Sequence, residues 1–152
     1  MNDELKIDSA TQRRHGDQYA VLVMDLDSFK QINDTYGHQA GDQVLKDFVE
    51  LIKAYSRKED RLFRFGGEEF LLLLPNTDQD SLQTVASHLQ QQVALQLKGP
   101  GGTVTMSSGG AILQRGEHWE TMLQRADQRL YLAKSAGRNR AIVADPLALA
   151  QE

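Results

Sequence analysis

The segment Arg61–Pro75 constrains the fold of this chain more than any other stretch of the sequence. An aromatic-rich run meets Gly66-Gly67, two acids follow, and an aliphatic run then ends at proline. This order predicts a strand, a tight turn and a second strand, because two glycines can supply the positive φ angles of a two-residue hairpin. Glu68 and Glu69 do not suit a plain hairpin, since acids are depleted in strands and adjacent negative charges repel. We therefore expect a positive charge beside this turn.

The overall composition is that of one soluble globular domain. The 152 residues are 40% hydrophobic and 25% charged, which allows a proper core and argues against disorder. A formal net charge of −4 argues against a nucleic-acid polymer as the main partner. The lack of cysteine excludes disulfides, thiolate zinc sites and cysteine nucleophiles. Because no apolar run approaches the roughly 18–20 residues of a membrane span and no signal peptide is recognised, we expect a cytoplasmic protein.

The hydrophobic pattern before the hairpin predicts one strand and two helices. Residues 19–27 form a continuous apolar run, typical of a strand covered on both faces, and Asp25 and Asp27 share one side at its end. Helical spacing follows, with a break at Tyr36-Gly37-His38 and a second helix beginning at Gly41 or Asp42.

After the hairpin, the pattern again alternates between helix and strand. It predicts a helix capped within 76–78, a glycine turn at 99–102, a strand with a glycine irregularity over 103–113, a helix over 117–134 that ends at Gly137, and a short strand over 140–143. These elements predict an α/β sandwich of the α+β type, with a central mixed, mainly antiparallel sheet flanked by helices. The hairpin is expected at the centre of the sheet, beside the strand that ends in Asp25. We expect the domain to span 18–145, with a helix or linker remnant at 1–17 and a loose tail at 146–152.

Three or four acids would converge if the first strand and the hairpin were neighbours, out of Asp25, Asp27, Glu68 and Glu69. Each acid alone fits a solvated surface position equally well. A converging set needs a cation, and hard oxygen ligands suit Mg²⁺ or Mn²⁺, which complete their shells with phosphate oxygens and water. The set therefore favours nucleoside-triphosphate chemistry, although the chain has neither a P-loop nor a GxGxxG motif.

Three segments resemble the GGDEF domains of diguanylate cyclases. Gly66-Gly67-Glu68-Glu69-Phe70 is similar to the GG(D/E)EF signature, and residues 25–42 (DLDSFKQINDTYGHQAGD) resemble the family's D-x-D-x-F-K-x-x-N-D-x-x-G-H-x-x-G-D block. Arg125-Ala126-Asp127 and residues 131–139 (YLAKSAGRN) resemble its closing helix. The resemblance covers roughly Arg13 to Val143. It implies a palm-like fold, as in adenylyl cyclases and polymerases, and the condensation of two GTP into cyclic di-GMP and two pyrophosphates.

The resemblance also implies a metal-assisted attack of a 3′-hydroxyl on the α-phosphate. Two Mg²⁺ or Mn²⁺ ions per site would be held by Asp25, Glu68, Glu69 and the backbone carbonyl of Leu26. Catalysis would depend on Asp25, Lys30, Glu68 and Glu69. Glu69 would either bind metal or handle the hydroxyl proton.

The GTP-binding residues that the resemblance implies are Phe29, Lys30, Asn33, Asp42, Gly67, Lys134 and Arg138. Asn33 and Asp42 would bind the guanine edge, although both residue types also cap helices well. Lys30, Lys134 and Arg138 would contact phosphates, or form a solvated basic edge. Gly67 would let the backbone approach the triphosphate, and the ring of Phe29 is expected in the core.

Arg57-Lys58-Glu59-Asp60 matches the family's R-x-x-D inhibitory site for cyclic di-GMP, five residues before the double glycine. The alternative is an ordinary ion pair at a helix end between Arg57 and Asp60. Turnover would require a homodimer, since each protomer holds one GTP. The segment Ile7–Arg14 is only faintly similar to the family's opening D-x-L-T-G-L-x-N-R-R, and we expect a sensor domain to be absent from this chain. The alternative functions are a cyclic di-GMP receptor and a GTP-binding regulatory module.

Overall fold

Strand β1 is the centre of a five-stranded sheet in this computed structural model, which describes residues 18–64 and 66–145. The strand order is β2-β3-β1-β6-β7, and every neighbouring pair is antiparallel except β6 with β7. The elements in chain order are β1 (Tyr19–Leu26), α2 (Phe29–Tyr36), α3 (His38–Tyr55), β2 (Arg61–Arg64), β3 (Glu69–Pro75), α4 (Gln79–Gln96), β4 (Lys98–Gly99), β5 (Gly102–Thr103), β6 (Met106–Ile112), α5 (Trp119–Ser135) and β7 (Arg140–Ile142). The predicted mixed, mainly antiparallel sheet is confirmed.

The hairpin lies at the edge of the sheet, so its predicted central position is wrong. Strand β2 has only four residues, with Arg61 and Arg64 at its exposed ends, which suits an edge strand. Strand β1 is buried along nearly its whole length and therefore needs partners on both sides. The predicted neighbourhood of β1 and the second hairpin strand, β3, is confirmed.

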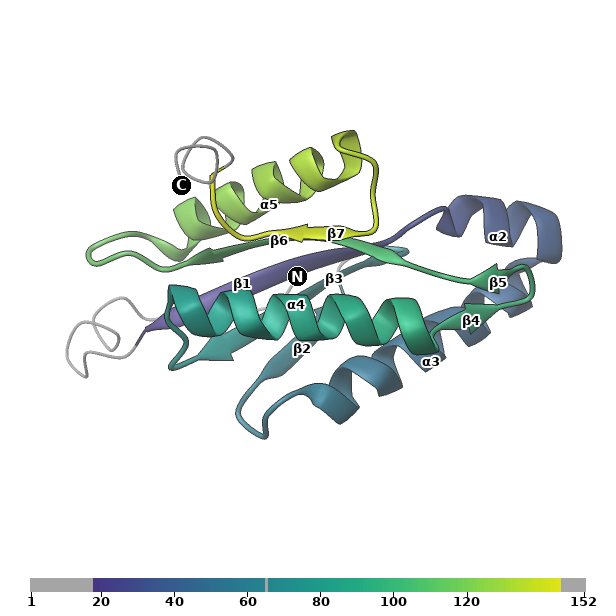
Figure 1. Cartoon of the computed structure of the whole chain (residues 1–152), viewed down its shortest axis with the longest axis horizontal. Coiled ribbons are helices and arrows are strands. Elements are labelled where there is room, and N and C mark those ends of the chain that lie inside the picture. The colour runs from purple at the N-terminus through teal and green to yellow at the C-terminus, as the bar shows by residue number, and fades with distance from the viewer. Residues whose placement is uncertain (1–17, 65, 146–152) are drawn as a thin grey trace.

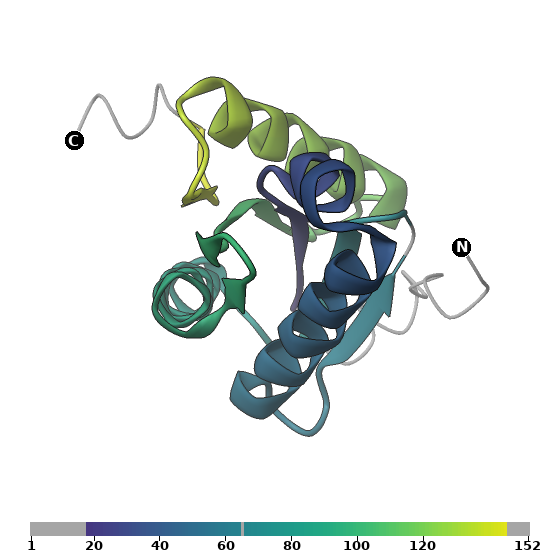
Figure 2. The same cartoon turned by 90° about the vertical axis from the view of Figure 1, so that its right-hand side faces the viewer.

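Helix α5 covers one face of the sheet, and α3 and α4 cover the other (Figures 1 and 2). The alternation of side chains along β1 divides the core accordingly. Leu22 and Met24 pack with the cluster that contains Phe48 of α3 and Leu89 of α4. Val21 and its neighbours on the other face pack with the side chains of α5. None of the described helices is long and apolar enough to cross a membrane.

The connection between β2 and β3 is wider than the predicted two-residue turn. The last cross-strand pair is Arg64 with Phe70, so five residues separate the paired positions. Neither Gly66 nor Gly67 has a φ in the left-handed region. The Arg64 side chain holds this wider loop instead, because its Nε donates to the Gly66 carbonyl at 3.1 Å and its Nη2 to the Gly67 carbonyl at 2.8 Å.

Two other predictions about glycines change in the structure. Gly37, with a φ of 93°, ends α2 as predicted, but α3 begins at once with His38 rather than at Gly41 or Asp42. The predicted glycine irregularity in β6 is instead a place of close packing. A Cβ on Gly109 would lie 2.2 Å from both the Ala126 carbonyl oxygen and the Leu130 nitrogen of α5.

Several local signals are confirmed. The Asp78 side chain accepts from the Ser81 backbone N–H at 2.8 Å and caps α4. Gly137, with a φ of 120°, follows the end of α5. The turn at 99–102 joins β4 to β5, a two-stranded ribbon that the sequence pattern did not predict. The expectations for residues 1–17 and 146–152 lie outside the described residues.

Candidate active site

The acids of β1 and β3 meet where the two strands pair. Asp25 lies directly opposite Glu69 in the antiparallel register. Because Val21 and Val23 face α5, the alternation of the strand places Asp25 on the same face, and Glu69 lies there by the same argument from Leu71 and Leu73. In this register Glu69, rather than Glu68, is the direct cross-strand neighbour of Asp25. Glu68 lies just before the strand, where its carbonyl accepts from the Leu26 N–H at 3.3 Å.

The positive charge expected beside this turn is that of Lys134 from α5. Its ammonium group donates a short hydrogen bond to Asp25, whose side chain is only 6% exposed. Burial raises the pKa of Glu68, and the negative charge of Asp25 raises it further, whereas Lys134 lowers it and Glu69 adds a smaller increase. The three carboxylates and one ammonium thus form a single electrostatic unit.

Asp27 does not belong to this unit, so three of the four acids converge, which is within the prediction of three or four. Its carboxylate is buried and accepts from the Thr105 hydroxyl at 2.6 Å, the Ser107 hydroxyl at 2.7 Å and the Asn139 backbone N–H at 3.0 Å.

No set of three or more described His, Asp or Glu side chains is arranged to hold a metal ion. Mg²⁺ commonly takes only one or two carboxylates and completes its shell with phosphate oxygens and water. Asp25 and Glu68 fit that requirement, because a cation would offset the repulsion that raises the pKa of Glu68.

The two predicted guanine-binding residues lie on facing helices. Asn33 of α2 packs against α3, where a Cβ on Gly41 would lie 1.9 Å from Asn33 Oδ1. Asp42 follows Gly41 directly and is exposed. The helix-capping alternative is not supported, because Gly37 is the N-cap of α3, Asp42 lies inside that helix, and neither α2 nor α3 has a side-chain cap hydrogen bond. Gly41 is a residue of the candidate site that the sequence analysis did not single out, although it is a fixed glycine of the block at 25–42.

Asp42 also lines a groove of about 560 Å³ between α3 and the β2–β3 hairpin. Leu45, Val49 and Phe70 give this groove an apolar wall, and Arg64 lies 6.0 Å from the centre of the Phe70 ring. An acid beside an apolar wall suits a flat heterocycle with N–H donors on one edge. Arg64 is a second residue that the sequence analysis missed.

The remaining predicted substrate-binding residues differ in their exposure. Lys30 and Arg138 are exposed, and their charged ends have no hydrogen-bond or ion-pair partner in the part of the chain that the structure describes. Phe29 is 6% exposed and packs in the core, as expected. Gly67 is open, because nothing lies within 4 Å of the Cβ position.

Helix α5 brings one further acid to the site. Asp127 lies on the surface of α5, where partial burial of its carboxylate raises its pKa and the negative charge of Glu69 raises it further. Asp127 belongs to the Arg-Ala-Asp segment that resembles the family's closing helix. That resemblance could have pointed to Asp127 from the sequence.

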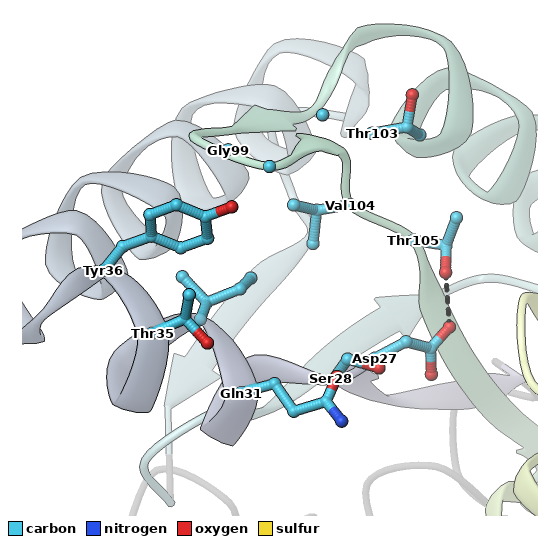
Figure 3. A pocket seen from close by; sticks show the side chains of 12 residues that line it. Asp27, Ser28, Gln31, Thr35, Tyr36, Gly99, Thr103, Val104 and Thr105 are labelled. Atoms are coloured by element: carbon cyan, nitrogen blue, oxygen red, sulfur yellow. Dashed lines mark hydrogen bonds between the residues drawn. The ribbon is translucent and has the colours of Figure 1, made fainter.

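A second cavity, of about 320 Å³, lies between α2 and the β4–β5 ribbon (Figure 3). Its lining includes Asp27, Gln31, Tyr36 and Thr105, but none of the residues predicted to bind GTP or metal. Asp27 therefore lies on the wall of this cavity, whereas Asp25, Glu68 and Glu69 do not line it.

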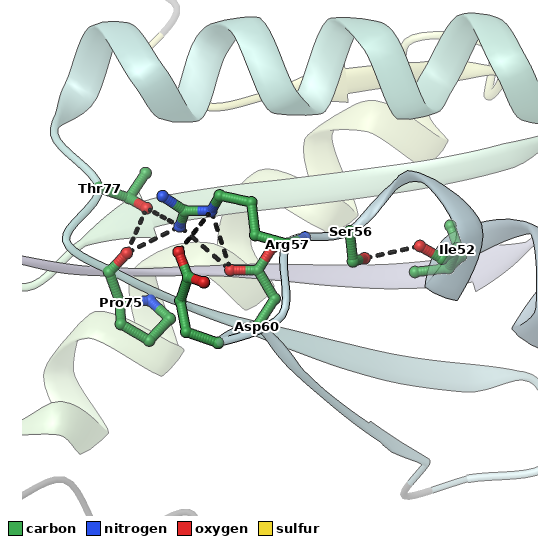
Figure 4. Close-up of polar contacts among 7 residues, drawn as sticks. Ile52, Ser56, Arg57, Asp60, Pro75 and Thr77 are labelled. Atoms are coloured by element: carbon green, nitrogen blue, oxygen red, sulfur yellow. Dashed lines mark hydrogen bonds and ion pairs between the residues drawn. The ribbon is translucent and has the colours of Figure 1, made fainter.

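Arg57 and Asp60 form a compact polar cluster at the opposite end of β3 (Figure 4). The Asp60 side chain is 3% exposed and accepts from the Arg57 backbone N–H at 2.7 Å and from its guanidinium at 3.0 and 3.2 Å. The same guanidinium donates to the Pro75 carbonyl at 2.7 Å and the Thr77 hydroxyl at 2.8 Å. Glu69 and Pro75 bound a seven-residue strand, so this cluster lies roughly 20 Å from the acids.

Comparisons with known proteins identify curated relatives of this chain. Diguanylate cyclase DgcP of Pseudomonas aeruginosa is 38% identical over 147 residues, which are 95% of this chain and 22% of that protein. Diguanylate cyclase DgcM of Escherichia coli K12 is 40% identical over 126 residues, which are 83% of this chain and 31% of that protein. The chain thus spans less than a third of the length of either curated relative.

Two solved structures are similar to the whole described fold. The GGDEF domain of DgcB from Caulobacter crescentus, in complex with c-di-GMP, has a TM-score of 0.85 at 34% identity, covering 93% of this chain and 86% of that one. The active GGEEF domain of a diguanylate cyclase from Vibrio cholerae has a TM-score of 0.86 at 30% identity, covering 93% and 92%. The family model described as "Diguanylate cyclase, GGDEF domain" matches residues 1–140. This chain therefore belongs to the GGDEF-domain family of diguanylate cyclases.

Proposed function

We propose that this chain is an active, GTP-specific diguanylate cyclase domain, which condenses two GTP molecules into cyclic di-GMP. In each of two equivalent steps, the 3′-oxygen of one GTP attacks the α-phosphorus of the other. A new P–O bond forms, the bond between the α-phosphorus and the bridging oxygen breaks, and pyrophosphate leaves. The observation that carries this proposal is the electrostatic unit that Asp25, Glu68, Glu69 and Lys134 form.

The acids of this unit would hold the metal ions of the reaction. Asp25, Glu68, Glu69 and the Leu26 carbonyl are the proposed ligands for two Mg²⁺ or Mn²⁺ ions, which would supply Lewis-acid stabilisation of charge at the α-phosphate. Glu69 is exposed and lies opposite Asp25, a position that also suits acceptance of the 3′-hydroxyl proton. Both roles of Glu69 remain in the proposal.

The cations around the acids would bind the triphosphate. Lys30 and Arg138 have unpaired charged ends among the described residues and are exposed, so they are available to phosphate oxygens. Lys134 would exchange its contact with Asp25 for a phosphate when metal-bound GTP arrives. Gly67, with open space at its Cβ position, would let the backbone approach the phosphates.

Guanine would be bound by Asn33 and Asp42. A carboxylate can accept from both the N1–H and the 2-amino group of guanine, a pair of donors that adenine does not present. The position of Asp42 beside the apolar wall of Leu45 and Phe70 supports this assignment. We therefore expect GTP rather than ATP as the substrate.

Turnover would require a homodimer with two sites face to face, working in the cytoplasm where GTP is available.

The product would inhibit by binding at Arg57 and Asp60. In the structure Arg57 is held by Asp60, Pro75 and Thr77, so its guanidinium would have to exchange the Pro75 and Thr77 contacts for guanine acceptors. A receptor for cyclic di-GMP is the second candidate, and the retained acids disfavour it, since a receptor needs no metal ligands.

The test is to incubate the purified chain with GTP and Mg²⁺ or Mn²⁺, with and without a dimerising fusion partner, and to measure cyclic di-GMP and pyrophosphate. We expect both products in a 1:2 ratio. Glu69→Gln should abolish turnover while the circular dichroism spectrum stays unchanged. If the dimerised chain forms no product yet binds cyclic di-GMP, the receptor function replaces the enzyme.

A further inference from the structure

The loop that follows α5 has an unusual backbone. Gly137, Arg138 and Asn139 have φ values of 120°, 66° and 49°, three consecutive residues in the left-handed half of the Ramachandran plot. Glycine adopts such angles freely and asparagine tolerates them, but an arginine there is strained. Two adjacent residues of this kind persist only where the surrounding structure holds them.

Asp27 is one of the groups that hold this loop. Its Oδ2 accepts from the Asn139 backbone N–H at 3.0 Å. The carboxylate itself is fixed by two hydroxyl groups, since Thr105 donates to Oδ2 at 2.6 Å and Ser107 donates to Oδ1 at 2.7 Å. Figure 3 shows the Thr105 contact. Because Asp27 is buried at the end of the central strand, it offers the loop a rigid acceptor.

Gln90 of α4 holds the same loop from the other side. Its Nε2 donates to the Asn139 side-chain oxygen at 2.9 Å and to the Met106 carbonyl at 2.8 Å. The Met106 carbonyl can only accept, so it fixes which end of the Gln90 amide points inward. Asn139 is therefore bound both through its backbone N–H and through its side chain.

Arg138 lies between this double anchor and the end of α5. Its backbone N–H donates to the Ala133 carbonyl at 3.0 Å, which closes the helix. With its backbone fixed on both sides, the point from which its side chain leaves the loop is set, while its guanidinium has no hydrogen-bond or ion-pair partner among the described residues. The strained loop thus presents an exposed guanidinium group.

Asp25 of β1 and Asp27, which follows that strand, therefore hold the C-terminal part of α5 and the loop after it at two points. Asp25 contacts Lys134, and Asp27 contacts Asn139, the neighbour of Arg138. We propose that Asp27 is a positioning residue of the cyclase: through the Asn139 amide it fixes the loop so that Arg138 points at the triphosphate of GTP. This inference rests on the proposed function, and it assigns to the second acid of the D-x-D segment a role that is distinct from metal binding.

A purely structural role for Asp27 makes a different prediction, and a double-mutant cycle separates the two. The dissociation constants of GTP and guanosine are measured by calorimetry for the wild-type chain, for Asp27→Asn and Arg138→Ala, and for the double variant. We expect Asp27→Asn to weaken GTP binding about tenfold, since a buried charge-assisted hydrogen bond is lost. Guanosine, which has no phosphate, should bind equally well to the wild-type chain and to Asp27→Asn. In the Arg138→Ala background, Asp27→Asn should change GTP binding less than about twofold.

Two further variants complete the test. Asp80→Asn makes the same chemical change at an exposed position in the first turn of α4, and should leave GTP binding unchanged. Gln90→Met removes the hydrogen bond to the Asn139 side chain without altering Asp27, so it should also weaken GTP binding. In the Arg138→Ala background, Gln90→Met should no longer weaken GTP binding. This variant decides the matter if Asp27→Asn does not fold, as judged by its thermal transition.

Each result has one meaning. An equal loss of GTP and guanosine binding, or an undiminished effect of Asp27→Asn or Gln90→Met without Arg138, would overturn the positioning role while leaving the proposed function intact. A wild-type chain that does not bind GTP would overturn both.

Discussion

Gly41 gives the sharpest test of how the guanine is recognised. Helix α3 begins three residues earlier than the sequence pattern predicts, so Gly41 lies inside the helix, and the Asn33 side chain occupies the space where a Cβ would be. A Cβ at this position would lie 1.9 Å from Asn33 Oδ1, whereas real Cβ atoms keep at least 3.0 Å. In Gly41→Ala, Asn33 Oδ1 must therefore move by about 1.1 Å.

The expected magnitude follows from two opposing terms. Displacing Asn33 removes a hydrogen bond to guanine and leaves a partner unpaired, which costs about 1–2 kcal/mol of binding free energy, or about 5- to 30-fold in Kd. Alanine in place of glycine favours the helix by up to about 1 kcal/mol, which offsets local strain. We therefore expect a variant that is about as stable as the wild-type chain but binds GTP more weakly.

The assay is calorimetric titration with GTP, together with urea unfolding of the same preparations. The matched control is the same substitution in an Asn33→Ala background, where no side chain is left to collide with the new methyl group. There Gly41→Ala should not weaken GTP binding further. Unchanged GTP affinity in the single variant, or an equal loss in both backgrounds, would refute the proposed link between Gly41 and Asn33.

Three other predictions concern the rest of the molecule. The pKa of Glu68 is raised in the folded state, so folded chains hold its proton more tightly than unfolded ones. The free energy of unfolding therefore declines as pH rises from the ordinary pKa of 4.5 through the raised pKa, and this contribution is constant above it. The Tm of Glu68→Gln should gain on that of the wild-type chain as pH rises from 4 to 7, and a pH-independent difference between the two would contradict this. Gly109→Ala places a methyl group against the backbone of α5 and should cost about 3 kcal/mol in urea unfolding, whereas Gly110→Ala, which meets the tip of Val143, should cost less. Arg57→Ala should leave initial cyclase rates intact but raise the cyclic di-GMP concentration needed for half-inhibition, and unchanged inhibition would remove Arg57 from the product site.

The sequence predicted those features that depend on local chemistry or on a strong pattern. The apolar run of β1, the stop at Gly37 and the cap at Asp78 follow from properties of a few adjacent residues, and all are confirmed. The pairing of β1 with β3 could also be predicted, because the acids at the ends of these strands needed a common cation.

What the sequence did not predict depends on contacts between distant segments. The shift from Glu68 to Glu69 as the partner of Asp25 is set by the strand register, which a one-residue change in loop length alters. Asp27 and Asp25 look equivalent in the sequence. The carboxylate of Asp27, however, accepts hydrogen bonds from Thr105, Ser107 and Asn139 and is therefore not part of the acid cluster. The role of Gly109 depends on the position of α5, which is fixed only by packing.

The central position of β1 has a consequence for how the chain is made. Strand β1 is buried along nearly its whole length, yet its two partners, β3 and β6, follow it in the chain, and the pairing with β6 extends to Ile112. A ribosome that adds roughly 5–20 residues per second needs about 4–17 s to supply the rest of that partner. During this interval α2 and α3 can form from local contacts and β3 can pair with β1, but the edge of β1 that pairs with β6 stays open. The nascent chain therefore exposes an apolar strand edge until β6 is made, and we expect its folding yield to depend on chaperones that bind extended apolar segments.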